Sequence, residues 1–197
     1  MAGQIEFWFD FASSYSYLSA MRIEQAATAE GVPVSWQPFL LGPIFAEQGW
    51  NNSPFNIYPA KGRYMWRDME RLCAERGLPL NVPENFPANS LKAARLALAI
   101  DETERRARFV RSVFSAEFGS DLDISEDSVL VDCLIEAGAS PETLSRANDA
   151  DIKADLFGQV ARAKSADMFG APSFLVGDEL FWGDDRLESA ILYAASI

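Results

Sequence analysis

The sequence of 197 residues contains no histidine. Histidine is the usual general base of serine and cysteine hydrolases and a frequent zinc ligand. Its absence excludes Ser-His-Asp and Cys-His catalytic arrangements and most zinc sites, and we predict that no metal is bound. Any chemistry must therefore use serine, tyrosine, lysine, carboxylates, backbone dipoles or a reagent that a ligand brings.

Cysteine is almost as scarce, because only Cys73 and Cys133 are present, far apart and each within an apolar, helix-like stretch. Two such thiols favour neither a disulfide framework nor a metal cluster. Free cysteine is commonly buried as a small apolar side chain. We therefore expect two reduced, buried thiols and a cytoplasmic location.

The chain also lacks positive charge and long apolar runs. Its 17 Lys and Arg residues oppose 29 Asp and Glu residues, which gives a net charge of −12 at pH 7. Phosphate backbones repel a chain this acidic, so we expect no nucleic acid partner. No run approaches the ~20 apolar residues that a membrane span needs, and the first ten residues do not resemble a secretory signal.

The first forty residues have the pattern of a strand–helix–strand unit. Residues 5–11 (IEFWFDF) and 32–39 (VPVSWQPF) are short, dense in β-branched and aromatic side chains, and typical of buried strands. Residues 15–31 between them carry a helical apolar stripe and end at Gly31. A unit of this length implies parallel strands joined by a right-handed crossover.

The rest of the chain is predicted to be mainly helical, with strands returning near the end. An irregular connector, residues 41–62, leads into helical periodicity that continues to residue 164. Residues 172–183 then have the pattern of a hairpin with a turn at Gly177, and residues 184–197 form a closing helix. The chain is thus expected to be an α/β protein with a large helical insertion.

Ser13 and Ser14 lie where the first strand turns into the first helix. A helix N-terminus has unpaired N–H groups and a partial positive charge, so a small hydroxyl there could hold an anion or a thiolate. Serine is also among the best N-cap residues. From this feature alone, the capping role is favoured for either serine.

Ala171 and Pro172 stand where a long helix ends and the last hairpin begins. A cis peptide bond before Pro172 would turn the N–H and C=O of Ala171 outward, where they could pair with an extended, peptide-like ligand. An ordinary trans proline that opens a strand is the more frequent alternative.

The order of elements, with a proline opening the third strand, resembles the thioredoxin fold, and the helical insertion resembles its DsbA-like branch. The resemblance divides the chain into a thioredoxin-like domain, residues 1–42 and 165–197, and a connector with a helical insertion, residues 43–164, whose last helix fits either part. Redox members begin the first helix with Cys-x-x-Cys. This chain has Ser13-Ser14-Tyr15-Ser16 there, which excludes a dithiol oxidoreductase at this site.

Three motifs narrow the resemblance: F-D-F-x-S at residues 9–13, P-x-K-G at residues 59–62, and F-G-A-P-S-F followed by F-W-G-x-D-R-L within residues 169–187. Together they resemble the 2-hydroxychromene-2-carboxylate isomerases and the related kappa-class glutathione transferases over nearly the whole chain. The resemblance implies a homodimeric enzyme of aromatic hydrocarbon catabolism that uses glutathione. No chemistry is assigned to Asp10 within the first motif.

The resemblance also implies where glutathione binds. Ser13 would hydrogen-bond the sulfur, and the Ala171 backbone, before a cis Pro172, would pair with the cysteinyl part. The remaining candidates extend along the tripeptide: Gly183, Asp184 and Asp185 at the γ-glutamyl end, Lys61 near the glycyl carboxylate, and Asn52 beside it. Asp185 also fits a capping box with Glu188. Relatives often have proline in place of Ser14, which leaves open which serine meets the sulfur.

The predicted reaction converts 2-hydroxychromene-2-carboxylate to trans-o-hydroxybenzylidenepyruvate, with glutathione as a reversible thiolate nucleophile. Four aromatic residues are candidate walls of the substrate site or parts of the core: Tyr15, Phe45, Tyr64 and Trp66. The alternatives are a kappa-class-like transferase that conjugates glutathione to an electrophile, and a non-catalytic module that binds glutathione or a peptide.

Overall fold

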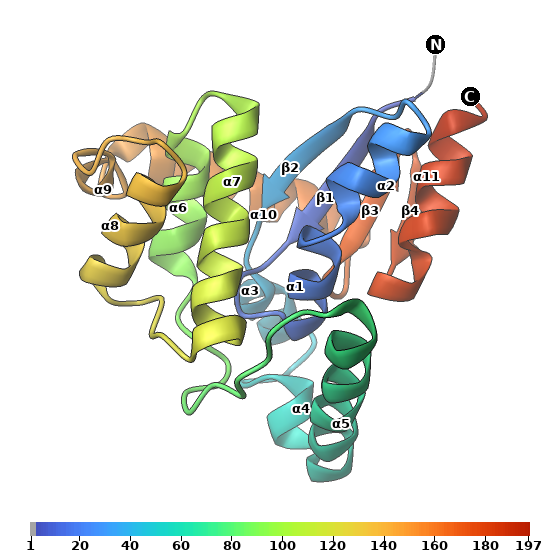
Figure 1. Ribbon diagram of the computed structural model, residues 1–197, viewed down its shortest axis with the longest axis horizontal. Coiled ribbons are helices and arrows are strands. Elements are labelled where there is room, and N and C mark those ends of the chain that lie inside the picture. The colour runs from blue at the N-terminus through green and yellow to red at the C-terminus, as the bar shows by residue number, and fades with distance from the viewer. Residues whose placement is uncertain (1–2) are drawn as a thin grey trace.

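The computed structural model describes residues 3–197 and contains a four-stranded sheet in the order β2-β1-β3-β4. Its strands are β1 (Ile5–Phe9), β2 (Val34–Pro38), β3 (Ser173–Val176) and β4 (Glu179–Trp182). Strand β2 is parallel to β1, whereas β3 is antiparallel to both β1 and β4. The predicted parallel unit and the terminal hairpin are therefore confirmed (Figure 1).

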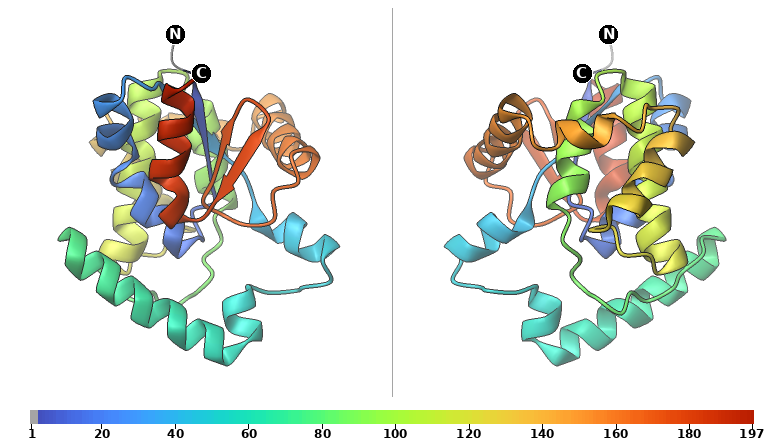
Figure 2. Two further views of the ribbon diagram at one scale, coloured as in Figure 1. Left: turned by 90° about the vertical axis from the view of Figure 1, so that its right-hand side faces the viewer. Right: turned by 90° about the vertical axis from the view of Figure 1, so that its left-hand side faces the viewer.

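Helices cover both faces of the sheet. Figure 2 shows α2 and α11 on one face and α10 on the other. The helices that belong to the terminal segments are α1 (Ser14–Ala20), α2 (Ile23–Ala29), the 3-10 turn η2 (Asp184–Arg186) and α11 (Leu187–Ala195). Those between β2 and β3 are α3 (Leu41–Glu47), α4 (Pro54–Ile57), α5 (Pro59–Arg76), α6 (Leu91–Ala99), α7 (Thr103–Phe114) with the π-helical η1 (Ser115–Gly119), α8 (Asp127–Glu136), α9 (Thr143–Arg146) and α10 (Ala150–Ser165).

The aromatic side chains of β1 explain why this strand lies at the centre. Phe7 and Phe9 point into the larger core, where Phe7 stacks on Phe174 of β3 with ring centroids 5.6 Å apart. Trp8 points to the opposite face and packs on Phe39. Burial of each such side chain contributes about 1.5–3 kcal/mol. Four of the five residues of β1 are buried, as the density of apolar residues in this strand predicted. The exception is Glu6, which is half-buried and accepts a hydrogen bond from the Trp8 indole N–H at 2.9 Å.

The strand register brings together the segments that contain Ser13 and Pro172. Trp8 of β1 pairs with Ser173 of β3, and Phe9 pairs with Pro38 of β2. The turn that leaves β1, the chain that leaves β2 and the chain that enters β3 therefore lie at the same end of the sheet. The helices α4 and α5 project from this end (Figure 2).

Two sequence expectations about helices are corrected by the structure. The helix expected over residues 15–31 is divided into α1 and α2, because Arg22 leaves the helical conformation (φ −131°, ψ −16°) and its guanidinium contacts Asp184. The connector at residues 41–62 contains α3, α4 and the start of α5, whose Pro59 occupies the first helical turn, where proline is tolerated. No helix among residues 3–197 is long and apolar enough to cross a membrane.

Candidate functional site

Ser13 is the N-cap of α1 and faces the segment that precedes β3. Its backbone is extended (φ −96°, ψ 112°), and its Oγ accepts a hydrogen bond from the Ser16 N–H at 3.3 Å. The same hydroxyl donates to the carbonyl oxygen of Ala171 at 3.0 Å, across 158 residues of sequence. The structure therefore brings together the two residues that were expected to hold the cysteinyl part of glutathione.

Ser14 points in a different direction. Its hydroxyl lies 3.1 Å from the Met65 sulfur of α5 and is fully enclosed by the core. Of the two serines that the sequence could not separate, Ser13 alone contacts Ala171. The capping function and the contact with Ala171 are both carried by this one hydroxyl.

The Ala171–Pro172 peptide bond is cis, as the resemblance implied. The segment around it is held by backbone contacts: the Gly183 N–H donates to the Pro172 carbonyl at 2.9 Å, and the Ser173 hydroxyl donates to the Gly170 carbonyl at 2.8 Å. Gly183 has a φ of +106°, which glycine adopts readily. The site is thus built on hydrogen-bonded backbone at the end of the sheet.

Asp10 anchors the turn that carries Ser13. Its buried carboxylate accepts hydrogen bonds from the Ala12 N–H at 3.0 Å, the Leu41 N–H at 2.7 Å and the Ser90 hydroxyl at 2.6 Å. Burial raises the pKa of Asp10, and these three hydrogen bonds act in the opposite direction. Asp10 therefore joins the ends of two parallel strands to the insertion, a positioning role that the sequence did not reveal.

Asp184 and Asp185, which were grouped together from the sequence, have different surroundings. Asp184 is buried, and its carboxylate accepts hydrogen bonds from the Ser19 hydroxyl at 2.8 Å and from Arg76 at 2.7 Å, with Arg22 at 3.2 Å. Asp185 is exposed and pairs with Arg186 at 2.9 Å. The capping box expected for Asp185 is wrong, because α11 has Arg186 as its N-cap and no side-chain cap.

The other two glutathione candidates belong to the insertion. Lys61 is exposed in the first turn of α5, one turn before Met65, with its Nζ 5.1 Å from the centre of the Tyr58 ring. The Asn52 side-chain oxygen accepts hydrogen bonds from the Ser53 N–H at 2.7 Å and the Asn56 amide at 3.1 Å. Since Met65 contacts Ser14, α5 brings Lys61 to the side of α1. No direct contact joins Lys61 or Asn52 to Ser13.

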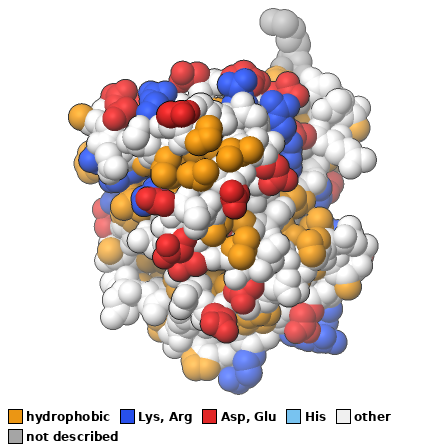
Figure 3. All heavy atoms as spheres, turned by 60° about the vertical axis from the view of Figure 1, so that its left-hand side comes forward, with side chains coloured by type: hydrophobic (Ala, Val, Ile, Leu, Met, Phe, Trp, Pro, Cys, Tyr) orange, Lys and Arg blue, Asp and Glu red, His pale blue; other side chains and the backbone are white. Residues whose placement is uncertain are grey.

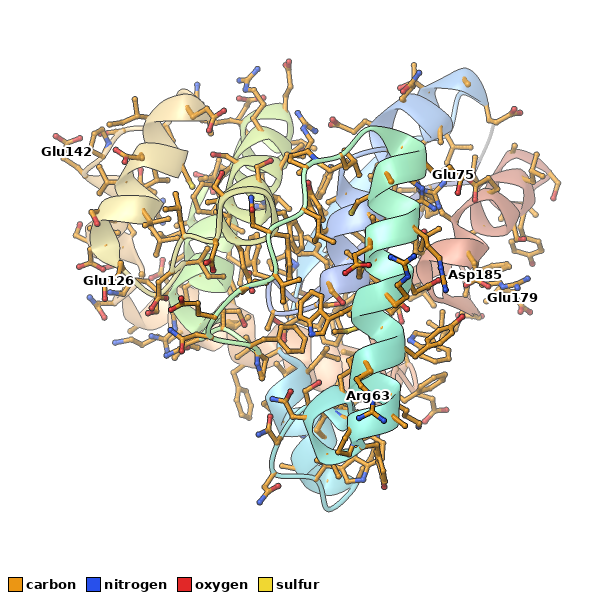
Figure 4. All side chains as sticks on the ribbon, turned by 60° about the horizontal axis from the view of Figure 1, so that its bottom comes forward. Arg63, Glu75, Glu126, Glu142, Glu179 and Asp185 are labelled. Atoms are coloured by element: carbon orange, nitrogen blue, oxygen red, sulfur yellow. The ribbon has the colours of Figure 1, made fainter. Side chains whose placement is uncertain are left out.

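Figure 4 gives a wider view of α5 beside the site. Arg63 lies near the start of this helix, and Asp185 lies to its side, between the levels of Arg63 and Glu75. The hydrogen bond from Arg76 to Asp184 confirms that the second half of α5 reaches η2. The insertion therefore borders the segment of the last β–α connection as well as α1.

The four aromatic candidates are arranged differently from one another. The Tyr15 hydroxyl donates to Asp68 at 2.9 Å, and burial, followed by this bond, raises the pKa of Tyr15. Trp66 packs edge-on against Phe86 with centroids 4.9 Å apart. Phe45 packs on Trp50, and Tyr64 is exposed. Their role as substrate walls stays a prediction.

The cysteines match the expectation from the sequence. Cys73 and Cys133 are both free and buried, and burial raises the pKa of each thiol. Within residues 3–197, no group of three or more Asp, Glu or Cys side chains is arranged to hold a metal ion. The Ser13 hydroxyl is the side-chain group that the structure places in hydrogen-bond contact with the Ala171 carbonyl, and neither cysteine lies within a hydrogen bond of it.

A cavity of about 360 Å³ is lined by residues of α6, α8, α9 and the loops beside them. None of its lining residues belongs to the segments that contain Ser13 or Ala171. Lys92 and Asp127, which form an ion pair, are among its lining residues. Figure 3 shows the side of the molecule on which the helical part comes forward, where hydrophobic side chains gather in one area between scattered charged groups. We assign no chemistry to this cavity.

Comparison with known proteins places this geometry in a wider context. The family model of the DSBA-like thioredoxin domain matches residues 4–191. The 2-hydroxychromene-2-carboxylate isomerase of Sphingobium xenophagum is 29% identical over 196 residues, which cover 95% of this chain and 96% of that protein. The glutathione S-transferase kappa 1 of Caenorhabditis elegans is 26% identical over 93% of this chain and 87% of that protein.

A solved structure of a 2-hydroxychromene-2-carboxylate isomerase superimposes with a TM-score of 0.85 at 26% identity, covering 95% of this chain and 93% of that one. The predicted DsbA-like thioredoxin fold is therefore confirmed. The resemblance to the two enzyme groups, which the sequence motifs indicated, is confirmed as well.

Proposed function

Because the chain belongs to the family of DSBA-like thioredoxin domains, we propose that it binds glutathione at Ser13 and acts as a 2-hydroxychromene-2-carboxylate isomerase. The observation that carries the proposal is the hydrogen bond of 3.0 Å from the Ser13 hydroxyl to the Ala171 carbonyl. It joins a hydroxyl at a helix start to the backbone before a cis proline. The isomerases among the relatives support the choice of reaction.

The hydrogen-bonding groups of this site fit a cysteinyl thiolate. The Ser13 hydroxyl donates its hydrogen bond to the Ala171 carbonyl and accepts one from the Ser16 N–H. A ligand N–H that pairs with the Ala171 carbonyl would release the Ser13 hydrogen. That hydrogen could then be donated to a sulfur anion, while the Ser16 N–H continues to hold Ser13 in place.

The gain from such a bond is large enough to activate a thiol. A hydrogen bond to a charged group contributes about 1.5–3 kcal/mol, and one unit of pKa corresponds to about 1.4 kcal/mol. Ser13 would therefore lower the pKa of a bound thiol by about one to two units. The thiol proton can pass to solvent, so the absence of histidine is no obstacle.

Bound glutathione would supply a thiolate that adds reversibly to a conjugated double bond, which permits rotation about that bond before the thiolate leaves. The residues of this chain would bind and orient the tripeptide. The exposed Asp185 carboxylate suits the γ-glutamyl ammonium, and the exposed Lys61 suits the glycyl carboxylate. The buried Asp184 would act through the position of η2, since its carboxylate already contacts Arg76.

A second candidate is a kappa-class-like transferase, which the 26% identity to a kappa-class enzyme favours. Both reactions would use the same sulfur site and differ in whether the adduct is the final product. Incubation with 2-hydroxychromene-2-carboxylate and substoichiometric glutathione separates them. Turnover without loss of thiol supports the isomerase, whereas consumption of one thiol per product supports the transferase.

The sulfur site itself is tested by the ultraviolet absorbance of the thiolate when glutathione is added near neutral pH. We expect a thiolate band with the wild type, loss of the band with Ser13→Ala, and an unchanged band with Ser14→Ala. An unchanged band with Ser13→Ala would contradict the proposal. Absence of a band in the wild type would favour a non-catalytic binding module. The cytoplasmic location and the homodimer remain predictions.

A further inference from the structure

Two large aromatic side chains are exposed beside the cis proline. Phe169 is 47% exposed and Trp182 is 51% exposed. Their ring centroids lie 4.8 Å apart, with an angle of 59° between the ring planes. Phe169 lies just before Gly170, and Trp182 ends β4. The pair therefore joins two chain segments that were recognised in the sequence only as parts of one motif.

The position of the Trp182 ring is fixed by its surroundings. A Cβ atom at Gly170 would lie 2.4 Å from the indole nitrogen, so only glycine leaves room for the ring at this place. Trp182 pairs in register with Ser173, and the next residue, Gly183, donates its N–H to the Pro172 carbonyl. The indole is thus held against the backbone that carries the cis peptide bond.

The same backbone links this pair of rings to the candidate site. Gly170, which contacts the indole, is the neighbour of Ala171, whose carbonyl accepts the Ser13 hydrogen bond. A ligand whose sulfur lies at Ser13 would therefore have exposed aromatic surface within reach. Two of the other candidate rings are already engaged, since the Tyr15 hydroxyl is bound to Asp68 and Trp66 packs on Phe86.

We propose that Phe169 and Trp182 form the surface on which the planar, conjugated part of the second substrate lies while its reacting carbon faces the sulfur at Ser13. This inference rests on the proposed function. Apolar and aromatic side chains with a few polar groups are typical of small-molecule sites. Two rings are too small an area for a stable protein interface, which buries about 1,200–2,000 Å² in total.

The test uses Phe169→Leu and Trp182→Leu in the full chain, with Phe157→Leu as the control. Phe157 is 78% exposed on α10, so Phe157→Leu removes an exposed aromatic ring at a different place on the surface. We expect each of the first two variants to raise the KM for 2-hydroxychromene-2-carboxylate about tenfold. The thiolate band with glutathione and the KM for glutathione should stay as in the wild type, and Phe157→Leu should change neither KM.

Gly170→Ala is a second variant that keeps both rings. The added Cβ meets the far end of the Trp182 side chain, so the indole must move while the backbone stays in place. We expect the same increase in the KM for the aromatic substrate, again with an unchanged thiolate band. Loss of the thiolate band in any of these variants would assign the residue to the glutathione site and overturn the inference.

A binding measurement makes the inference testable without turnover. Equilibrium dialysis of 2-naphthoate, a planar aromatic carboxylate, in the presence of glutathione should show binding to the wild type and to Phe157→Leu but about tenfold weaker binding to Trp182→Leu. Equal binding by all variants, or none by the wild type, overturns the inference.

Sedimentation gives a further test. If Phe169→Leu and Trp182→Leu change the oligomeric state and Phe157→Leu does not, the rings belong to a contact between copies of the chain and the inference is overturned. Failure of the proposed function is distinct, because it removes the wild-type thiolate band.

Discussion

Arg76 of α5 donates a hydrogen bond of 2.7 Å to the buried carboxylate of Asp184 in η2, across 108 residues of sequence. The same carboxylate accepts from Ser19 of α1 and from Arg22, at the break between α1 and α2. One carboxylate thus connects the helix that starts at Ser13, the helix that carries Lys61 and the turn that carries Asp185. The three parts of the proposed glutathione site have a common anchor.

Replacement of this anchor should reduce stability. Asp184→Asn would leave Arg22 and Arg76 without their buried counter-charge, and we expect a loss of about 2–3 kcal/mol in the free energy of unfolding, since both guanidinium groups retain some contact with water. Urea unfolding measures this. Asp185→Asn is the control, because Asp185 is exposed, and it should change stability by less than about 0.5 kcal/mol. Equal stabilities of the two variants would contradict the role of Asp184.

Glu117 in η1 should make stability depend on pH. It is 1% exposed, and neither carboxylate oxygen has a hydrogen-bond partner within residues 3–197. Burial, and then the charges of Asp10 and Asp123, raise its pKa well above the usual value. Between the unfolded and the folded pKa the folded state binds more protons, so stability falls as pH rises through this interval.

Glu117→Gln should therefore weaken this fall, and its gain in stability over the wild type should be larger at pH 8 than at about pH 5. Urea unfolding at several pH values gives the comparison. Glu126→Gln removes the same charge from an exposed position and should leave the wild-type slope in place. Parallel curves for Glu117→Gln and the wild type would show that Glu117 does not carry the effect.

Gly62 of the P-x-K-G motif should tolerate no side chain. A Cβ atom there would lie 2.2 Å from the Phe55 carbonyl oxygen, which belongs to the backbone of α4. Gly62→Ala must push α4 and α5 apart, and we expect a loss of about 1–3 kcal/mol and a raised KM for glutathione through the neighbouring Lys61. In contrast, Gly158→Ala in α10 meets nothing within 4 Å and should stabilise the protein by up to about 1 kcal/mol. Destabilisation by both substitutions would contradict the steric argument.

The thiols should be unreactive in the folded protein. Cys73 and Cys133 are buried, and burial raises the pKa of both, so little thiolate forms near neutral pH. Titration with a disulfide reagent should label both cysteines rapidly in urea and neither rapidly in buffer. Rapid labelling of one cysteine in the folded protein would contradict this prediction, because it would show an accessible thiol that could take part in thiol–disulfide exchange.

The sequence was sufficient for the four strands and for the helical character of the insertion, because these follow from local patterns, such as the apolar residues of β1 and the glycine and proline positions around β3. The meeting of Ser13 with the backbone before Pro172 was expected through the resemblance to the thioredoxin fold. The separate helices α3 and α4 were not predicted. The sequence did not predict the break at Arg22, since the break depends on a contact with Asp184 that exists only after folding. The same is true of Asp184, whose burial no local pattern reveals.

Side-chain direction was likewise beyond the sequence. Ser13 and Ser14 are adjacent and chemically identical, yet one contacts Ala171 and the other Met65, because the start of α1 turns successive side chains in different directions. Phe169 and Trp182 both lie within the F-G-A-P-S-F and F-W-G-x-D-R-L motifs, and Gly170, which leaves room for the Trp182 ring, was the one sequence feature that pointed to their contact. The steric reason for glycine at position 170 becomes clear only when the register of β3 and β4 is known, because that register places the Trp182 ring beside it.

The pairing of Trp8 with Ser173 has a consequence for how proteins of this family diversify. The neighbouring strands β1 and β3 set the distance between the Ser13 hydroxyl and Pro172. More than a hundred residues, between the end of β2 and the start of β3, leave the sheet at this end and return to it. Insertions, deletions or substitutions in this inserted segment could therefore change which substrate shapes the protein accepts. The groups proposed to bind the sulfur would be inherited unchanged, provided that the contacts of Asp10 with Ser90 and of Asp184 with Arg76 were preserved.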